Sequence, residues 1–144
     1  MKLLSDDKAS YLTLDADRTD LNCYPSYNLT VEVADGDFRG AVVTWVSLDD
    51  MEAFVHQLDD CERTWRGAAS LVSISIDEFE LHIESSNSLG HFVARYRLTC
   101  RSFQREGQMA QTLSGGFNLD SELFANLVRD FAAFVSSLPH PNRR

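Results

Sequence analysis

The sequence predicts an α+β domain: a mainly antiparallel sheet of about six to seven strands, with two amphipathic helices packed on one face. Three observations predict this fold class. The expected elements run in the order strands, helix, strands, helix; most neighbouring strands are separated by short turns; and both helical segments carry an apolar stripe. With 144 residues, 44% hydrophobic and 24% charged, the chain is expected to form one domain with short flexible ends at about residues 1–8 and 139–144.

The first half of the chain begins with strands. Residues 11–14 are a short candidate, and residues 27–33 alternate between apolar and polar side chains, as a half-buried strand does. Asp35 and Gly36 supply a tight turn, after which residues 38–46 form the return strand. The two longer strands are therefore expected to form an antiparallel hairpin.

A helix is expected after the hairpin. Ser47 is a suitable N-cap, and the acidic residues just after it lie where the helix dipole favours negative charge. Gly67 can adopt the left-handed conformation that ends a helix. The apolar stripe, which is expected to be buried, repeats at three- and four-residue spacing and comprises Leu48, Met51, Phe54, Val55, Leu58 and Cys61.

Two further strand candidates follow this helix. They cover residues 69–76 and 79–84, separated by Asp77 and Glu78. The apolar side chains lie at even positions in the first candidate and at odd positions in the second. A tight turn or a bulge is therefore expected between them.

The chain then continues with two long strands and a final helix. The strands are expected over residues 91–103 and 109–119, with a turn between them. Asp120 is a suitable N-cap for a helix over residues 121–137, whose apolar positions again repeat at helical spacing. This helix is expected to pack on the sheet beside the first one.

Acidic residues are concentrated near the N-terminus. The chain has 13 basic and 22 acidic residues, a formal net charge of −9, but the first 62 residues alone hold 14 acids and four bases, a balance of −10. Phosphate backbones repel such a protein, so nucleic acid is not expected as a direct partner. The acidic segment is either a solvated surface that maintains solubility or a face that binds a basic partner.

The sequence carries no pattern for export or membrane insertion. No apolar segment of signal-peptide length follows Met1, and no apolar run approaches the roughly 18 residues of a membrane span. The cysteines Cys23, Cys61 and Cys100 form no metal-binding motif, and Cys61 and Cys100 are expected to be small core residues. We therefore expect a cytoplasmic protein that has no metal or cofactor and does not contact a membrane.

A polar row is expected on the strands of the second half. Arg95, Arg97 and Arg101 share one strand face and could bind a phosphate or a carboxylate. Opposite Glu80 and Glu84 of a neighbouring strand, the same arginines would form cross-strand ion pairs, and this is the interpretation that we favour.

Two histidines and two tryptophans have a functional and a structural interpretation. His82 lies between the two glutamates and could act as a base, although a row of polar residues on the solvent-exposed face of a sheet also explains its position. His56 stands four residues from Glu52 and from Asp60 and could hold a divalent ion weakly, but a solvated helix face is favoured. Trp45 and Trp65 flank the first helix and are expected at the core or its edge; an exposed tryptophan would mark an interface.

The order of structural residues resembles the small bacterial proteins known as WapI-type immunity proteins. The resemblance runs from about Tyr24 to Leu138 and depends on tryptophan, glycine and apolar positions. Trp45 precedes the first helix and a Trp-Arg-Gly-Ala-Ala-Ser-Leu segment, residues 65–71, follows it. A Gly-His pair at residues 90–91 opens a long strand, and Gly-Phe-Asn-Leu-Asp at residues 116–120 leads into the final helix.

This resemblance implies a cytoplasmic antitoxin that binds and blocks the toxic domain of a secreted toxin. Many such domains have basic clefts, which the acidic front segment would complement. The expected contact acids lie on the hairpin turn and the first helix: Asp35, Asp37, Asp49, Asp50, Glu52, Asp59 and Asp60.

Two other interpretations also fit the sequence. One is a small enzyme or ligand-binding domain that uses a polar site on the sheet face, with His82, His91, Arg95 and Arg97 as candidates. The other is a homodimeric structural module that makes its contact through a sheet edge or an exposed tryptophan.

Overall fold

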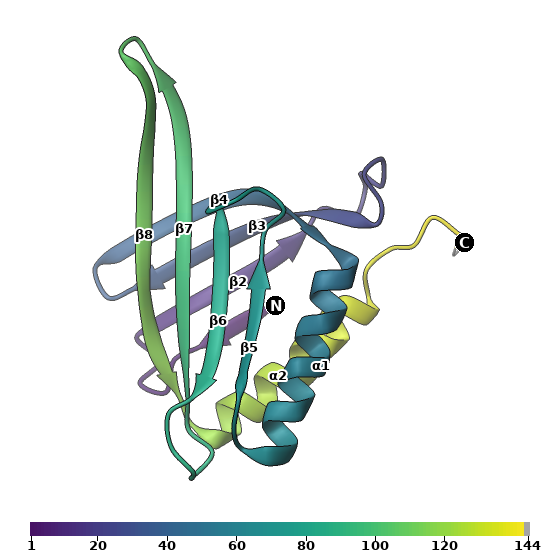
Figure 1. The fold of residues 1–144 in the computed structure, drawn as a ribbon, viewed down its shortest axis with the longest axis vertical. Coiled ribbons are helices and arrows are strands. Elements are labelled where there is room, and N and C mark those ends of the chain that lie inside the picture. The colour runs from purple at the N-terminus through teal and green to yellow at the C-terminus, as the bar shows by residue number, and fades with distance from the viewer. Residues whose placement is uncertain (143–144) are drawn as a thin grey trace.

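A computed structural model describes residues 1–142 and shows an α+β fold with eight strands and two helices (Figure 1). The elements, in chain order, are β1 (Lys2–Leu4), β2 (Ser10–Ala16), β3 (Ser26–Asp35), β4 (Phe38–Ser47), α1 (Leu48–Thr64), β5 (Ala68–Val72), β6 (Phe79–Ser85), β7 (Phe92–Gln104), β8 (Gly107–Leu119) and α2 (Ser121–Ser136). The α+β class is therefore confirmed.

The strands form two sheets, so the expectation of one sheet with six to seven strands is wrong. One sheet has the order β1-β2-β3-β4 and the other β5-β6-β7-β8, and every neighbouring pair is antiparallel. The strands of the second sheet run across those of the first, and α1 and α2 lie together at one side (Figure 1). The 17-residue helix α1 separates β4 from β5, so these two strands cannot pair as hairpin neighbours do.

The helix caps agree with the sequence. The predicted hairpin is β3–β4, with Gly36 at φ +60° in its turn. Ser47 accepts a hydrogen bond from the backbone N–H of Asp50 at 3.1 Å, and Asp120 accepts one from Leu123 at 2.8 Å. Trp65 holds the left-handed conformation directly after α1, two residues before the predicted glycine.

The segment after β5 departs from the predicted strand. The strand ends at Val72, and the buried positions in β5 and β6 are all odd, so the apolar side chains of Ile74 and Ile76 are 54% and 81% exposed. The predicted turn is present: Asp77 has φ +64°, and the N–H of Ser73 donates to the carbonyl of Phe79 at 2.9 Å. The even-numbered apolar residues therefore lie outside the core.

Hydrogen bonds connect segments near both ends of the described chain to its strands. β1 lies within residues 1–8 and pairs with β2, and the terminal amino group of Met1 donates to the carbonyl of Leu14 at 2.9 Å. At the other end, the Tyr27 hydroxyl donates to the carbonyl of Pro139 at 2.6 Å. Residues 143–144 of the predicted C-terminal end lie outside the described residues.

One apolar core joins both sheets and both helices. Phe54 of α1 meets Phe131 of α2 edge to face at 4.9 Å, and Phe124 of α2 stacks on Phe92 of β7 at 3.7 Å between ring centroids. Cys61 is buried in this core, as predicted, but Cys100 is exposed because β7 has by then run past the core. In the described part of the chain, no helix is long and apolar enough to span a membrane.

Candidate functional site

Five of the seven predicted contact acids lie on the solvent-facing side of α1. Asp49, Asp50, Glu52, Asp59 and Asp60 are all exposed, whereas the apolar stripe of the same helix is buried at Met51, Phe54, Leu58 and Cys61 and partly buried at Leu48 and Val55. Only Asp60 forms an ion pair within residues 1–142, with Arg63 at 2.7 Å. We call these five residues the α1 acidic face. It presents several carboxylates on a rigid element without neutralising partners.

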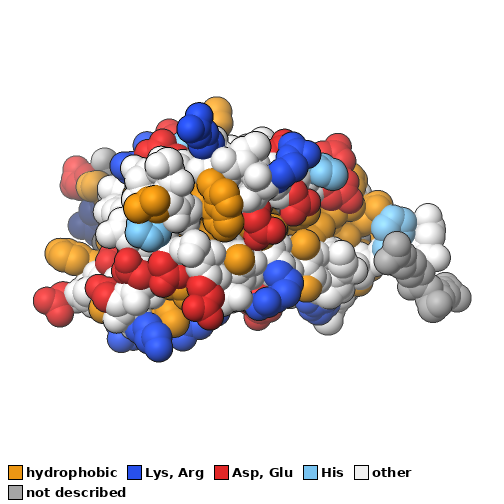
Figure 2. All heavy atoms as spheres, turned by 90° about the horizontal axis from the view of Figure 1, so that it is seen from below, with side chains coloured by type: hydrophobic (Ala, Val, Ile, Leu, Met, Phe, Trp, Pro, Cys, Tyr) orange, Lys and Arg blue, Asp and Glu red, His pale blue; other side chains and the backbone are white. Residues whose placement is uncertain are grey.

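The other two predicted acids lie at the far end of the first sheet. Asp35 and Asp37 flank the β3–β4 turn, and α1 begins only after the ten residues of β4, about 30 Å of extended strand away. On the side of the molecule drawn in Figure 2, acidic side chains gather in more than one place, with basic ones between them. The seven acids therefore do not form one surface.

Asp35 makes contacts inside the protein rather than facing a partner. Its carboxylate accepts a hydrogen bond from the Ser10 hydroxyl at 2.7 Å and another from the Tyr96 hydroxyl. Tyr96 is 4% exposed, and burial together with the Asp35 carboxylate raises the pKa of this phenol well above its usual range. The contact joins β3 of the first sheet to β7 of the second. Asp35 is therefore a structural residue.

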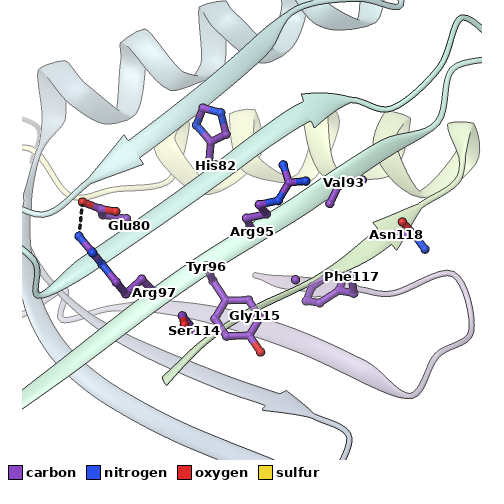
Figure 3. A pocket seen from close by; sticks show the side chains of 11 residues that line it. Glu80, His82, Val93, Arg95, Tyr96, Arg97, Ser114, Gly115, Phe117 and Asn118 are labelled. Atoms are coloured by element: carbon purple, nitrogen blue, oxygen red, sulfur yellow. Dashed lines mark hydrogen bonds and ion pairs between the residues drawn. The ribbon is translucent and has the colours of Figure 1, made fainter. Parts of the chain in front are cut away.

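The outer face of the second sheet holds an open pocket of about 600 Å³ (Figure 3). Three of the four residues of the ligand-site interpretation, His82, Arg95 and Arg97, lie in it. The fourth, His91, lies apart, beside a smaller cavity, where its ring contacts the Asn87 side chain at 3.0 Å. The pocket is lined by Glu80, His82, Val93, Arg95, Tyr96, Arg97, Ser114, Gly115, Gly116, Phe117 and Asn118.

Both arginines of this pocket are paired with acids. Arg97 contacts Asp77 at 2.6 Å and Glu80 at 2.9 Å, and Arg95 contacts Glu84. Glu80 lies directly opposite Arg97 in the β6–β7 register, which confirms the predicted cross-strand ion pairs for Arg95 and Arg97. Because these carboxylates neutralise the guanidinium charges, the pocket offers little net positive charge to an anionic ligand. The buried Nε of Arg97 has no hydrogen-bond partner among the described residues. Arg101 lies beyond the end of β6 and forms no ion pair within residues 1–142.

A serine that the sequence analysis missed lies beside His82. Ser70 stands opposite His82 in the β5–β6 register, and its hydroxyl is 2.5 Å from the Nδ1 atom. Glu84 is 3.8 Å from the Nε2 atom, too far for a hydrogen bond. A nucleophilic serine also needs donors for an oxyanion, but the Ser70 N–H already donates to the Gln57 side chain at 2.9 Å. The arrangement is a polar cross-strand contact. Ser70 and His82 are brought together by the register of β5 with β6, which cannot be read from the sequence.

The remaining candidates are surface or packing residues. His56 lies on the exposed side of α1 near Glu52, and no group of metal-ligating side chains occurs within the described part of the chain. Trp65 is 38% exposed and covers Gly90, where an added Cβ would approach the indole ring to 2.9 Å. Trp45 is partly buried. Trp65 is therefore an exposed tryptophan, the case that the sequence associates with an interface, although its ring lies 6.5 Å from that of the core residue Phe124.

Comparison with known proteins adds no assignment to this geometry. The chain matches no protein-family model, and a search of curated proteins finds no match. The resemblance to WapI-type immunity proteins accordingly stays a prediction from the order of structural residues.

Proposed function

We propose that this protein is a non-enzymatic binding protein that neutralises a basic toxin domain through the α1 acidic face. This is the cytoplasmic immunity role that the resemblance to WapI-type proteins implies. The proposed contact residues are those of the α1 acidic face alone, because Asp35 is engaged inside the protein and Asp37 lies at the opposite end of β4.

The observation that carries this proposal is a row of unpaired carboxylates on a rigid helix. Four of the five acids of the α1 acidic face have no ion-pair partner within residues 1–142. The buried side of α1 is fixed by Met51, Phe54 and Leu58, so little order has to be gained on binding. Such an arrangement steers a basic partner toward the helix and accelerates association.

The enzyme interpretation has weaker support from the same geometry. The arginines of the sheet-face pocket are neutralised by acids, and His82 contacts a serine whose backbone N–H is already bonded. Catalysis of acyl or phosphoryl transfer requires donors directed at the charge that develops in the transition state. The side chains of this pocket satisfy one another instead.

The test is a charge reversal on α1 with a matched reversal on the first sheet. Glu52→Lys/Asp59→Lys changes two exposed acids of the α1 acidic face, and Asp15→Lys/Glu32→Lys changes two exposed acids on β2 and β3. The partner is a basic protein recovered from the native host at low salt that arrests growth when expressed alone. We expect the α1 pair to slow association by about tenfold or more at low salt, and the control pair to change it much less.

Three results would contradict the proposal. One is that no basic growth-arresting protein is recovered even at low salt. Another is that both double variants slow association equally, which would indicate a net-charge effect rather than a site. The third is that the α1 variant loses its circular dichroism signal, which would place these acids in the folded core rather than on the surface.

A further inference from the structure

The β7–β8 hairpin extends beyond the rest of the second sheet. β7 pairs with β8 over 13 residue pairs, but β6 pairs with β7 only as far as Leu98. Residues 100–111 therefore form an arm, which rises clear of the body (Figure 1). Every residue of this arm is exposed, and Phe103 at its end is 88% exposed.

The outer edge of β8 carries unpaired backbone groups at even-numbered residues. The N–H of Thr99 donates to Glu78 on the β6 side, so the odd residues of β7 face β6 and the even ones face β8. The register of β7 with β8 then directs the odd residues of β8 inward and the even residues outward. Asn118 fits this assignment, because its carbonyl accepts a hydrogen bond from Asp6 outside the sheet. The outward residues before it are Gln108, Ala110, Thr112, Ser114 and Gly116.

The other three sheet edges are short, covered or partly contacted. β1 has only three residues. The edge of β4 is contacted at two carbonyls: that of Trp45 accepts from the N–H of Ile74, just after β5, at 2.9 Å, and that of Ala41 from the Cys100 thiol of β7 at 3.1 Å. The edge of β5 is covered by α1, whose Gln57 bonds Ser70. Outside the β7–β8 ladder, the backbone groups of the five outward residues of β8 form no hydrogen bond with the backbone of any described residue.

The composition of β8 does nothing to block pairing with another strand. Proteins protect exposed edges with charged side chains, prolines, bulges or short strands. β8 is 13 residues long, contains no charged residue and no proline, and keeps an unbroken register with β7. An edge of this length and composition is a template for a further strand.

We propose that β8 pairs antiparallel with β8 of a second copy of this chain, joining the two second sheets into one eight-stranded sheet across a two-fold axis. An antiparallel strand can pair with itself about such an axis, and the contact closes at a dimer. The even-numbered N–H and C=O groups of the two β8 strands would then satisfy one another.

The uncharged strand β8 adds no like-charge repulsion against a second copy at this edge. Two chains of net charge −9 repel each other at most approaches, but β8 is uncharged and the hairpin of residues 92–119 holds four arginines and one glutamate. Asp6, Asp35 and the start of β4 lie beside β8, but α1, which carries the α1 acidic face, lies against β5 at the opposite edge of the same sheet. The dimer therefore leaves the α1 acidic face free, and it does not depend on the proposed toxin binding.

The surface beside β8 offers a further apolar contact. A cavity of about 320 Å³ lies between the start of β4 and the middle of β8. Phe38, Gly40 and Leu113 are in its lining. Phe38 is 69% exposed. A strand added at the edge of β8 would lie over this cavity and remove Phe38 from water, which adds apolar burial to the new hydrogen bonds.

The test measures the mass of the full chain by sedimentation from micromolar to millimolar concentration. We expect a reversible rise from 16.2 kDa to twice that mass. Ser114→Pro removes an outward N–H without removing a β7–β8 hydrogen bond, and the two-fold axis makes the loss occur twice, so self-association should weaken by about tenfold or more. Ser114→Ala keeps the N–H and should associate as the native chain does. Amide exchange at Ala110 and Thr112 should slow as the dimer forms.

Ala110→Lys provides a second variant in case the proline disturbs folding, because it sets a charged side chain on the edge strand of each copy while retaining the backbone donors. Circular dichroism confirms that each variant is folded. A native chain that stays at 16.2 kDa at millimolar concentration overturns the proposal, as does a dimer that both variants leave unchanged. Protection of the β8 amides that appears only on addition of a basic partner also overturns it, by assigning the edge to that partner.

Discussion

The two outer strands of the second sheet, β5 and β8, are opposite in length, cover and charge. β5 has five residues and lies under α1, which bonds its outward N–H at Ser70 through Gln57. β8 has 13 residues, no charged side chain and no cover over most of its length. The same sheet thus has one edge that a helix has closed and one edge that is open.

This difference separates two kinds of recognition. At the covered edge, backbone groups are satisfied and the outward surface is made of helix side chains, so charge decides what can bind. At the open edge, backbone groups are available and side chains carry no charge, so any compatible strand can bind by hydrogen bonding. A basic partner at α1 and a second copy at β8 are therefore independent, and each can be removed without the other.

The largest expected effect is a loss of stability when a buried ring of α1, the helix that covers β5, is removed. Phe54→Ala removes a fully buried ring that meets Phe131 across the two helices, and we expect it to lower the free energy of unfolding by about 3–5 kcal/mol. Phe103→Ala removes an equally large ring from the exposed arm and should change it by less than about 0.5 kcal/mol. Urea denaturation measures both. A comparable loss in the two variants would show that the arm is packed against something in solution.

The local elements of this fold were predictable from sequence because their signals are local. Cap residues such as Ser47 and Asp120, and the Asp-Gly turn between β3 and β4, act over three or four residues, and the structure places them as expected. The division into two sheets was not predictable in this way. It depends on which strands meet after α1, and periodicity within a strand does not encode that choice.

The segment of Val72, Ile74 and Ile76 shows how a local pattern can mislead. Alternating apolar residues predicted a buried strand face, but the strand ends at Val72 and all three side chains are more than 40% exposed. The neighbouring positions Leu71 and Ser73 are buried instead. Tertiary packing selected the face that holds a serine, because Ser73 bonds the backbone of the following turn.

The candidate contact acids also include some that the sequence predicted well and one that it did not. The five acids of the α1 acidic face are all exposed, as their positions outside the apolar stripe of the helix indicate. Helical spacing gave no means to see that Asp35 would meet Tyr96, which lies 61 residues later in the chain. Contacts between strands of different sheets follow from the crossing of the sheets, and sequence separation conceals them.

A smaller effect is expected where the first sheet supports the base of the β7–β8 hairpin. Tyr96→Phe removes the hydrogen bond to the Asp35 carboxylate and should lower the free energy of unfolding by about 1.5–3 kcal/mol at neutral pH. The raised pKa of Tyr96 means that the native protein keeps the phenol proton at a pH where the unfolded chain, with a pKa of about 10, releases it. The native chain therefore loses stability as the pH rises above about 10.

The variant lacks this group, so the difference in stability between the native chain and Tyr96→Phe should narrow above pH ~10. Urea denaturation at neutral pH and at a series of alkaline values measures the difference. Tyr27, whose pKa burial also raises, is present in both proteins and cancels. A difference that stays constant with pH would mean that Tyr96 ionises alike in the folded and unfolded chains.

The smallest loss of stability is expected from removing the one side chain, that of Gln57, that bonds the outer edge of β5. Gln57→Ala removes the acceptor for the Ser70 N–H at an exposed position, so the global loss should be at most about 1 kcal/mol. The local change is sharper: exchange of the Ser70 amide should accelerate about fivefold beyond that of Leu71, whose position in the register directs its N–H to β6. If the two amides accelerate equally, α1 covers this edge by packing alone. Ser70 would then resemble the open positions of β8 more closely than its hydrogen bond indicates.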